Sequence, residues 1–251
     1  MRAGIALYLA LASADRLLEA TVREAAMSSP EWWEAHHQLA KLKPGTSWFG
    51  PIGRAIARDI AKKYTRSCAL GDAVVLGSGF SKTPYWLART GAFRRVYGID
   101  SSISAVRAMS RYAKALDHGG RGGWDIVRYV KADVTRPGQF RRDASLVLDE
   151  GVLDVLQAGP GIDPAARSAA RQVMEEYLER VLELVRPGGA LVVVGYAGDP
   201  SVVNQSTLEL SCWTRHGGFL GLDALGADPR RACSPWGPGA YVLHSRGPQP
   251  P

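Results

Sequence analysis

The sequence has few cysteines and no long uninterrupted apolar segment, and both absences narrow the class of protein. Its 251 residues include three cysteines, which lie far apart at positions 68, 212 and 233. No Cys-x-x-Cys pair and no Cys/His cluster has metal-ligand spacing, which argues against a disulfide scaffold and a metal centre. No segment reaches the roughly 18–20 apolar residues that cross a membrane. We therefore expect a cytoplasmic protein without integral membrane association.

The rest of the composition is that of an ordinary globular protein. Apolar residues make up 46% of the chain and charged residues 22%, values typical of soluble domains. A chain of this length can form one α/β domain with a full core and is short for two. The net charge of +7 is compatible with an acidic protein partner, a nucleic acid or an anionic cofactor, and it selects none of them.

The N-terminal segment allows two interpretations. The stretch through Asp15 has one basic residue, an apolar run and an Ala-Ser-Ala sequence, features of a weak secretory signal or an organellar presequence. Apolar residues continue at helical spacing as far as Val22, so we expect an amphipathic helix and keep a cleaved signal as the alternative. We predict a helical lead-in over 1–50, one domain over 51–246 and a flexible tail over 247–251.

From Ala73 onward, short apolar segments alternate with segments of helical periodicity. Five expected strands lie at 73–77, 95–100, 126–133, 145–150 and 190–196. Expected helices lie between them at about 82–89, 103–116 and 164–185. Apolar strands separated by helices indicate a mostly parallel sheet covered on both faces. Two weaker strands, 219–222 and 241–245, would add a C-terminal antiparallel hairpin. The pattern predicts an α/β, Rossmann-like sheet of seven strands.

A glycine turn, Gly77-Ser78-Gly79, follows the first expected strand and precedes a helix. Glycine adopts backbone dihedrals closed to other residues and lets a ligand approach the backbone. The helix behind the turn begins with free N–H groups. A dinucleotide-binding turn has a third glycine where this chain has Lys82. The turn therefore favours a ligand group smaller than a pyrophosphate, and a tight connection that binds nothing is the alternative.

Asp100 ends the next expected strand, 21 residues after Gly79. A carboxylate at this place can accept hydrogen bonds from both hydroxyls of a ribose. It could instead cap the helix that follows, a frequent use of aspartate. Ser101 or Ser102 can cap that helix equally well, which would leave Asp100 available to a ligand.

Acidic residues also end the third and fourth expected strands. Asp133 could accept a hydrogen bond from the amine of an adenine while Val134 packs against the ring, or it could form the turn before Thr135. Asp149 and Glu150 end the fourth strand, and because neighbouring strand residues face opposite ways, we expect one of them to enter the site. Open α/β sheets bind ligands at the carboxyl ends of their strands, so these residues predict a single site.

With these motifs, the chain resembles the seven-strand class I S-adenosylmethionine (SAM)-dependent methyltransferases over about residues 30–245. VVLGSGFS resembles their glycine turn, YGIDSS the ribose-binding segment, KADV the adenine-side strand end, SLVLDEGVLDVL the fourth-strand motif, and VRPGGALVVVGY the turn and strand that follow. The resemblance implies SAM as the cofactor. The residues that it implies for binding SAM are Trp48, Gly77, Ser78, Gly79, Asp100, Ser101, Ser102, Asp133, Val134 and Asp149.

Within the class, the chain is most similar to the elongation-factor and citrate-synthase lysine methyltransferases. Members have a Trp-Phe or Trp-Tyr element ahead of the glycine turn, here Trp48-Phe49-Gly50, and the phrase Asp-Lys-Gly-Thr-Leu-Asp-Ala-Leu, here 149–156. The resemblance implies a protein substrate whose lysine is methylated, with Asp149 and then Glu150 as catalytic candidates. It also implies that Trp48 and Phe49 close over the cofactor, although packing in the core is an equal alternative for them.

This chain departs from the group's pattern at three positions. Glu150 replaces a basic residue, Val152 replaces a threonine, and Phe80 stands where a small polar residue is usual. Contacts to the substrate are therefore expected to differ, and a non-catalytic relative that binds a partner is one alternative. Methylation of a small molecule or of RNA is another, RNA because of the basic helix expected over 51–66. A nicotinamide-dependent oxidoreductase would use the same glycine turn and Asp100, although the residue at position 82 and the final hairpin argue against it.

Overall fold

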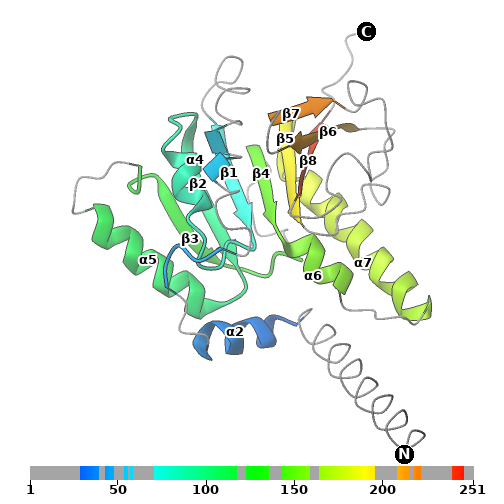
Figure 1. Ribbon diagram of the computed structural model, residues 1–251, viewed down its shortest axis with the longest axis horizontal. Helices are drawn as coiled ribbons and strands as arrows, with labels where there is room; N and C mark the ends of the chain where they lie inside the picture. The colour runs from blue at the N-terminus through cyan, green and yellow to red at the C-terminus, as the bar shows by residue number, and fades with distance from the viewer. Residues whose placement is uncertain are drawn as a thin grey trace, which may run out of the picture.

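A computed structural model of the chain shows a central sheet with helices on both sides (Figure 1). The structure describes residues 29–39, 43–47, 54–55, 57–58, 71–117, 123–135, 143–158, 164–195, 208–214, 218–221 and 239–245. Within these residues the sheet has eight strands in the order β3-β2-β1-β4-β5-β8-β6-β7. The strands are β1 Gly71–Leu76, β2 Phe93–Asp100, β3 Val127–Lys131, β4 Ala144–Glu150, β5 Val185–Gly195, β6 Leu208–Thr214, β7 Gly218–Gly221 and β8 Gly239–Ser245.

Strands β1 to β5 are parallel to one another, and the last three strands pair in antiparallel fashion. β1 lies between β2 and β4, β3 pairs with β2, and β5 pairs with β4. β8 is antiparallel to both β5 and β6, and β7 is antiparallel to β6. All seven residues of β4 are buried, which is why, apart from Ser145, its sequence is apolar up to the two acids at its end.

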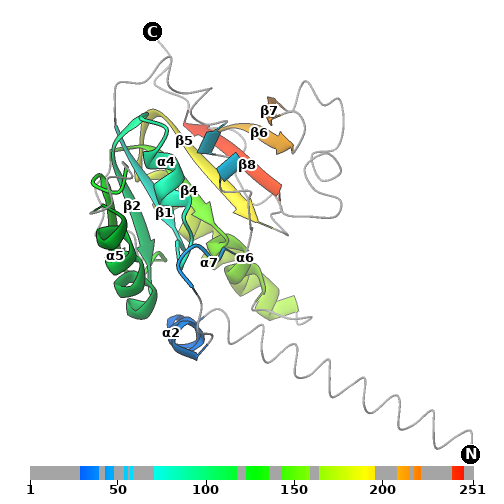
Figure 2. The ribbon, with the colours of Figure 1, turned by 60° about the vertical axis from the view of Figure 1, so that its left-hand side comes forward.

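The helices cover the sheet on two faces (Figures 1 and 2). They are α2 Pro30–Leu39, α4 Thr83–Ala88, α5 Ile103–Asp117, α6 Val152–Ala158 and α7 Pro164–Leu182. On one face, Tyr177 of α7 packs with Val147 of β4 in the larger core cluster. On the other face, Leu87 of α4 and Ala113 of α5 belong to a second cluster with Val75 of β1. Each face of the parallel half of the sheet is therefore buried under helices.

The predicted fold class is confirmed, with differences in the C-terminal half. Both expected C-terminal strands are present, as β7 and β8, but they do not pair with each other. The unpredicted strand β6 lies between them, so the hairpin is formed by β6 and β7 and the sheet has one more strand than expected. The short helix α6 was not predicted either. At seven residues, it has two turns, too few to show a helical period in the sequence.

The turn expected from Arg186-Pro187-Gly188-Gly189 lies inside β5. Val185 pairs with Ala144 and Ala190 pairs with Leu146, with an irregularity between the two pairs. A Cβ atom on Gly189 would stand 2.8 Å from the Val185 side chain and 2.9 Å from the carbonyl oxygen of Arg186. Only glycine fits this close approach of the chain to itself.

Helix α2, part of the predicted lead-in, lies beside the end of the sheet at which β1 and β2 finish (Figure 2). Its side chains contact the glycine turn and the start of α5, as detailed below. The lead-in before residue 29, most of the helix expected over 51–66, the segment Trp48-Phe49-Gly50 and the tail lie outside the described residues. Among the helices that the structure describes, none has both the length and the apolar character needed to span a membrane.

Candidate functional site

The glycine turn between β1 and α4 has the backbone geometry that only glycine adopts readily. The φ angles of Gly77 and Gly79 are +67° and +43°, in the left-handed region. A Cβ atom on Gly77 would stand 2.7 Å from the side chain of Val152, so the turn passes directly against the end of β4. The N–H of Ser78 donates to the carbonyl oxygen of Ile99 at 3.0 Å, which joins the turn to β2.

Asp100, at the end of β2, faces this turn. Its Oδ2 accepts a hydrogen bond from the N–H of Gly79 at 2.8 Å, and its Oδ1 accepts one from the N–H of Ser102 at 2.8 Å. Burial raises the pKa of Asp100, and these two backbone hydrogen bonds oppose the rise. Each carboxylate oxygen has a second lone pair, so both can still accept a hydrogen bond from a ligand.

Ser102 caps α5, and it is one of the two serines that the sequence predicted for this role. Its hydroxyl accepts a hydrogen bond from the N–H of Ala105 at 3.2 Å and donates one to Glu34 at 2.8 Å. Ser102 is fully buried, whereas Ser101 beside it is half-buried. Asp100 is therefore not needed as the cap of α5. The predicted contacts of Ser101 and Ser102 with a cofactor stay predictions.

Helix α2 brings Glu34, which the sequence did not single out, to the N-terminus of α5. Its carboxylate accepts hydrogen bonds from the hydroxyl and the N–H of Ser104 as well as from Ser102. Burial raises the pKa of Glu34, but hydrogen bonds from Ser104 and Ser102 outweigh it and lower the pKa to about 2. An ionised carboxylate at a helix N-terminus stabilises that helix, so Glu34 anchors α2 to α5.

His37, one helical turn after Glu34, is the second residue of α2 that reaches the site. Its ring lies edge-on to that of Phe80, with the centroids 5.3 Å apart. The side chain is 8% exposed, and its Nδ1 is buried with no hydrogen-bond partner in the described part of the chain. Glu34 and His37 are three residues apart and share one helix face, a spacing that a search for ligand residues in the lead-in could have used.

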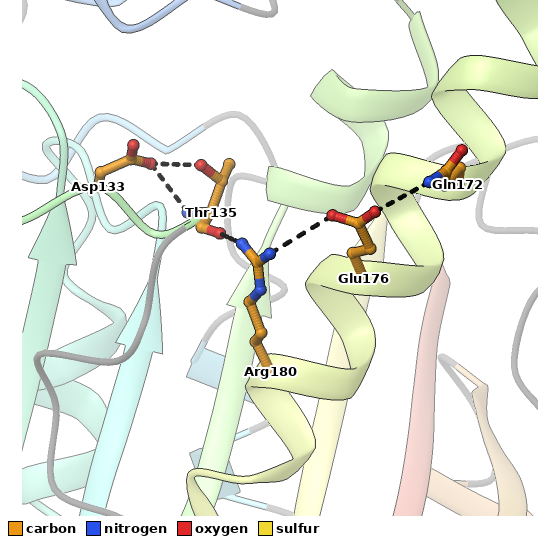
Figure 3. A network of polar contacts seen from close by, with 5 residues as sticks. All are labelled: Asp133, Thr135, Gln172, Glu176 and Arg180. Carbon is orange, nitrogen blue, oxygen red and sulfur yellow. Dashed lines mark hydrogen bonds and ion pairs between the residues drawn. The ribbon is translucent and has the colours of Figure 1, made fainter.

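Asp133, after β3, is held by the turn that it forms (Figure 3). Its Oδ1 accepts hydrogen bonds from the N–H and the hydroxyl of Thr135, at 2.9 and 2.6 Å. Arg180 of α7 donates to the carbonyl oxygen of Thr135 at 2.9 Å and forms an ion pair with Glu176, to which Gln172 donates as well. This network ties the loop after β3 to α7. The turn-forming alternative for Asp133 is thus realised, and its contact with an adenine stays a prediction.

Val134, the other residue predicted beside the adenine, is 7% exposed and belongs to the larger core cluster with Ala132. Its position at the end of β3, on the face covered by α6 and α7, is compatible with a ring lying against it. The contact of Val134 with an adenine stays a prediction.

Asp149 caps α6, the short helix that begins three residues later. Its Oδ1 accepts the N–H of Val152 at 2.7 Å, and its Oδ2 accepts the N–H of Leu153 at 3.2 Å and the hydroxyl of Tyr177 at 2.8 Å. Such a cap satisfies N–H groups that the first turn of a helix leaves without partners. Both oxygens of Asp149 therefore have structural partners.

Glu150 points to the opposite face of the sheet, as alternation along a strand predicts. Its Oε1 accepts hydrogen bonds from the hydroxyls of Ser47, Ser81 and Thr83, at 3.0, 2.8 and 3.1 Å. Its Oε2 is buried and has no hydrogen-bond partner in the residues that the structure describes. Glu150 thus ties the end of β4 to the segment that follows the glycine turn.

The two acids at the end of β4 both hold protons more strongly than usual. Burial is the largest cause and raises the pKa of Asp149 and of Glu150 to about 7 in each case. Hydrogen bonds oppose the rise, from Tyr177 for Asp149 and from Ser81 for Glu150. Carboxyl groups with such pKa values can exchange a proton near neutral pH.

The structure thus brings Gly79 and Asp100 together, adds His37 and Glu34 from α2, and separates Asp149 from Glu150 across the sheet. Trp48 lies outside the described residues. In the described part of the chain, no three His, Cys, Asp or Glu side chains are grouped so that they could hold a metal ion.

Several solved structures with a similar fold are methyltransferases. The CcbJ methyltransferase from Streptomyces caelestis is 16% identical, with a TM-score of 0.50 over 79% of this chain and 91% of that one. A protein from Methanococcus maripaludis, assigned as an S-adenosyl-L-methionine-dependent methyltransferase, is 13% identical, with a TM-score of 0.51 over 89% and 95%. A TehB-like SAM-dependent methyltransferase from Corynebacterium glutamicum is 15% identical, with a TM-score of 0.50 over 87% and 100%.

No protein-family model matches the sequence. At these low identities, the likeness concerns the arrangement of strands and helices and not the residues of the site. The chain has the fold of the SAM-dependent methyltransferases.

Proposed function

We propose that this chain binds SAM and transfers its methyl group, with Asp100 holding the ribose. The observation that carries the proposal is the pairing of Asp100 with the glycine turn. The N–H of Gly79 holds the carboxylate in place. Ser102 caps helix α5, so Asp100 is not needed for that role. A buried carboxylate oriented in this way is suited to accept hydrogen bonds from two neighbouring hydroxyls.

Gly79 keeps the position next to Asp100 free of a side chain. A Cβ atom at this residue would stand 3.7 Å from Nε2 of His37 and 3.9 Å from Oδ2 of Asp100. A side chain there would fill the position between these groups, and glycine leaves it to a ligand. The backbone of the turn, Ser78 and the end of β2 would then hold the nucleoside, while the ends of β3 and β4 lie on its further side.

The order of the strands favours SAM over a nicotinamide dinucleotide. Dinucleotide-binding folds continue the order 3-2-1-4-5 with a further parallel strand. In this chain the strand beside β5 is β8, which is antiparallel. The missing third glycine of the turn, replaced by Lys82, supports the same choice.

When bound, SAM supplies a methyl group on a sulfonium, already activated for in-line transfer to a nucleophile. The chain's own part is to position the two partners and to exclude water. In this proposal, Asp100 and the glycine turn bind the nucleoside, and Asp149 holds the start of α6 beside it. Glu150 holds the segment after the turn through Ser81 and Thr83.

We infer that the acceptor is a protein lysine, as the resemblance of the segment at 149–156 implies. An amine must lose a proton before it can be methylated. Of the two acids proposed as catalytic, Glu150 is the better suited to hold that proton, because its Oε2 has no partner in the described residues. Both oxygens of Asp149 accept hydrogen bonds from the start of α6, so Asp149 is suited to holding this helix in position.

Cofactor binding is tested by thermal unfolding in the presence of SAM, S-adenosylhomocysteine or NAD. We expect the first two to raise the midpoint and NAD to leave it unchanged. Asp100→Ala should remove most of the rise. A rise with NAD alone would overturn the proposal, and an unchanged response of Asp100→Ala would show that the ribose lies elsewhere.

The acceptor is tested separately with SAM carrying a labelled methyl group. The protein is added to a cell lysate, and the label is followed into protein, RNA and small molecules. We expect label in a protein band, retained after digestion of RNA and reduced with Glu150→Gln. Label only in RNA or in small molecules would contradict the lysine acceptor and leave the cofactor proposal intact.

A further inference from the structure

The side of Gly79 that faces α2 contains two polar groups, and only Asp100 was expected there. The other is the imidazole of His37. Nε2 of His37 and Oδ2 of Asp100 lie at 3.7 and 3.9 Å from the position of a Cβ atom on Gly79. They therefore approach the same small space from two elements, α2 and β2, that are far apart in the sequence.

The ring of His37 is held in place on several sides. It contacts Phe80 edge-on, and Trp33 of the preceding turn of α2 lies 5.7 Å from it between centroids. Glu34 fixes α2 through the hydroxyls of Ser102 and Ser104, directly after Asp100 in the chain. The imidazole is thus positioned by the same segment that carries the carboxylate.

The hydrogen-bonding capacity of the imidazole is not used by the described residues. Nδ1 is buried without a partner, and none of the described residues forms a hydrogen bond with Nε2. Burial is the main cause that lowers the pKa of His37 to about 4, and the neighbouring His36 adds to it, so the ring is neutral at physiological pH. A neutral imidazole has one N–H donor and one acceptor nitrogen. Nε2 is the nitrogen that lies beside Gly79, so it is the one that a ligand at this position can reach.

We propose that His37 is a further cofactor-binding residue, which hydrogen-bonds one hydroxyl of the ribose while Asp100 accepts from that diol across Gly79. The inference rests on the proposed binding of SAM and names the sugar of that cofactor as the group that both residues recognise. A ribose diol donates and accepts hydrogen bonds at each oxygen. A carboxylate, which only accepts, and an imidazole, which also donates, complement it.

The test is calorimetric titration with S-adenosylhomocysteine and with its 2′-deoxy and 3′-deoxy forms. His37→Phe keeps an aromatic ring against Phe80 and removes both nitrogens. His36→Phe, on the same helix, is the matched control. We expect His37→Phe to weaken binding of S-adenosylhomocysteine about five- to tenfold, the loss of one hydrogen bond. His37→Phe and the wild type should bind one deoxy form equally tightly, namely the form that lacks the hydroxyl that His37 contacts. His36→Phe should bind all three ligands as the wild type does.

The outcomes separate this inference from the proposed function. If the wild type does not bind S-adenosylhomocysteine, the cofactor proposal itself fails. If His37→Phe binds S-adenosylhomocysteine as tightly as the wild type, or weakens binding of all three ligands equally, the ring does not recognise the sugar and this inference alone is overturned. Should His37→Phe not fold, His37→Leu is titrated in its place with the same expectations.

Discussion

The carboxylate of Glu150 accepts a hydrogen bond from the hydroxyl of Ser81 at 2.8 Å, which joins the end of β4 to the segment after the glycine turn of β1. Thr83 and Ser47 donate to the same oxygen. Because three hydroxyls donate to one buried oxygen, this carboxylate holds the segment after the turn in place. Its replacement should therefore affect stability as well as ligand binding.

We expect Glu150→Ala to lower the free energy of unfolding by about 2–4 kcal/mol, because buried hydroxyls lose their acceptor and a cavity is left. Glu150→Gln keeps an oxygen at the same place and should lose less than half as much. Urea denaturation of the two variants at neutral pH measures the difference. Equal losses would mean that the acceptor oxygen is not what stabilises the segment.

The same residue predicts a dependence of stability on pH. Burial raises the pKa of Glu150 from 4.5 to about 7, so between these values the folded chain keeps a proton that the unfolded chain has lost. The contribution of Glu150 to the free energy of unfolding is therefore fully present below about pH 4.5 and falls as the pH rises to about 7. The free energy of unfolding of the wild type minus that of Glu150→Gln should fall by about 1–3 kcal/mol between pH 5 and pH 8.

Urea titrations of both proteins across this range measure that difference. Other groups with shifted pKa values, such as His37, largely cancel because both proteins contain them. A difference that stays constant or rises with pH would contradict the assigned direction.

Two tyrosines with buried hydroxyls should respond in opposite ways to loss of that hydroxyl. Tyr177 donates to Asp149 at 2.8 Å, whereas the hydroxyl of Tyr129 is buried with no partner in the described residues. We expect Tyr177→Phe to lower the free energy of unfolding by about 1–2 kcal/mol, and Tyr129→Phe to leave it unchanged or raise it. Chemical denaturation of both variants measures this, and a Tyr177→Phe protein as stable as the wild type would show that the bond to Asp149 contributes nothing.

Gly79 and Gly91 form a matched pair for the ligand site. Both have positive φ angles, +43° and +69°, so replacement by alanine costs roughly 1–2 kcal/mol of backbone strain at each. A Cβ atom on Gly79 stands between His37 and Asp100, whereas one on Gly91 meets no atom within 4 Å. Gly79→Ala should weaken binding of S-adenosylhomocysteine at least about tenfold, and Gly91→Ala should not. Equal affinities by calorimetry would exclude the space beside Gly79 as the ligand site.

Anchoring of α2 should depend on Glu34 and not on Glu31, an exposed acid in the first turn of the same helix. Glu34→Gln weakens charge-assisted hydrogen bonds to Ser102 and Ser104, so amide hydrogen exchange over 30–39 should become about tenfold faster. Glu31→Gln should leave it unchanged. Mass spectrometry of peptides from this segment measures the rates, and unaltered exchange in Glu34→Gln would refute the anchor.

The sequence was sufficient for the parallel half of the fold. β1 and β4 are buried along almost their whole length, so the sequence shows them as apolar segments. β2 and β3 also have exposed residues, and they were predicted from the alternation of short apolar segments with segments of helical periodicity. The glycine turn and Asp100 could be predicted as parts of the candidate site because both lie at the junction of a strand and a helix, where the residue type indicates the backbone geometry. Strand β6 was not found, and with it the true partner of β7, because Leu208–Thr214 mixes polar and apolar residues at the border of the sheet.

The site was predictable only where its parts are local in the chain. Capping by Asp149 was not foreseen, because it depends on α6, a helix too short to show a period. Glu34 and Ser102 are 68 residues apart, and nothing in the sequence of α2 specifies that it packs against the start of α5. The hydroxyls on Glu150 come from three positions up to 103 residues away, a convergence that only the folded chain reveals.

The position of β8 between β5 and β6 has a consequence for synthesis of the protein on the ribosome. β6 and β7 are made before β8, yet among the described strands β8 alone joins β6 to the rest of the sheet. Until residues 239–245 have left the exit tunnel, the β6–β7 hairpin has no strand to join and β5 has an open side. Vectorial folding can therefore complete the parallel half early, whereas β6, β7 and β8 can dock together only after β8 has emerged.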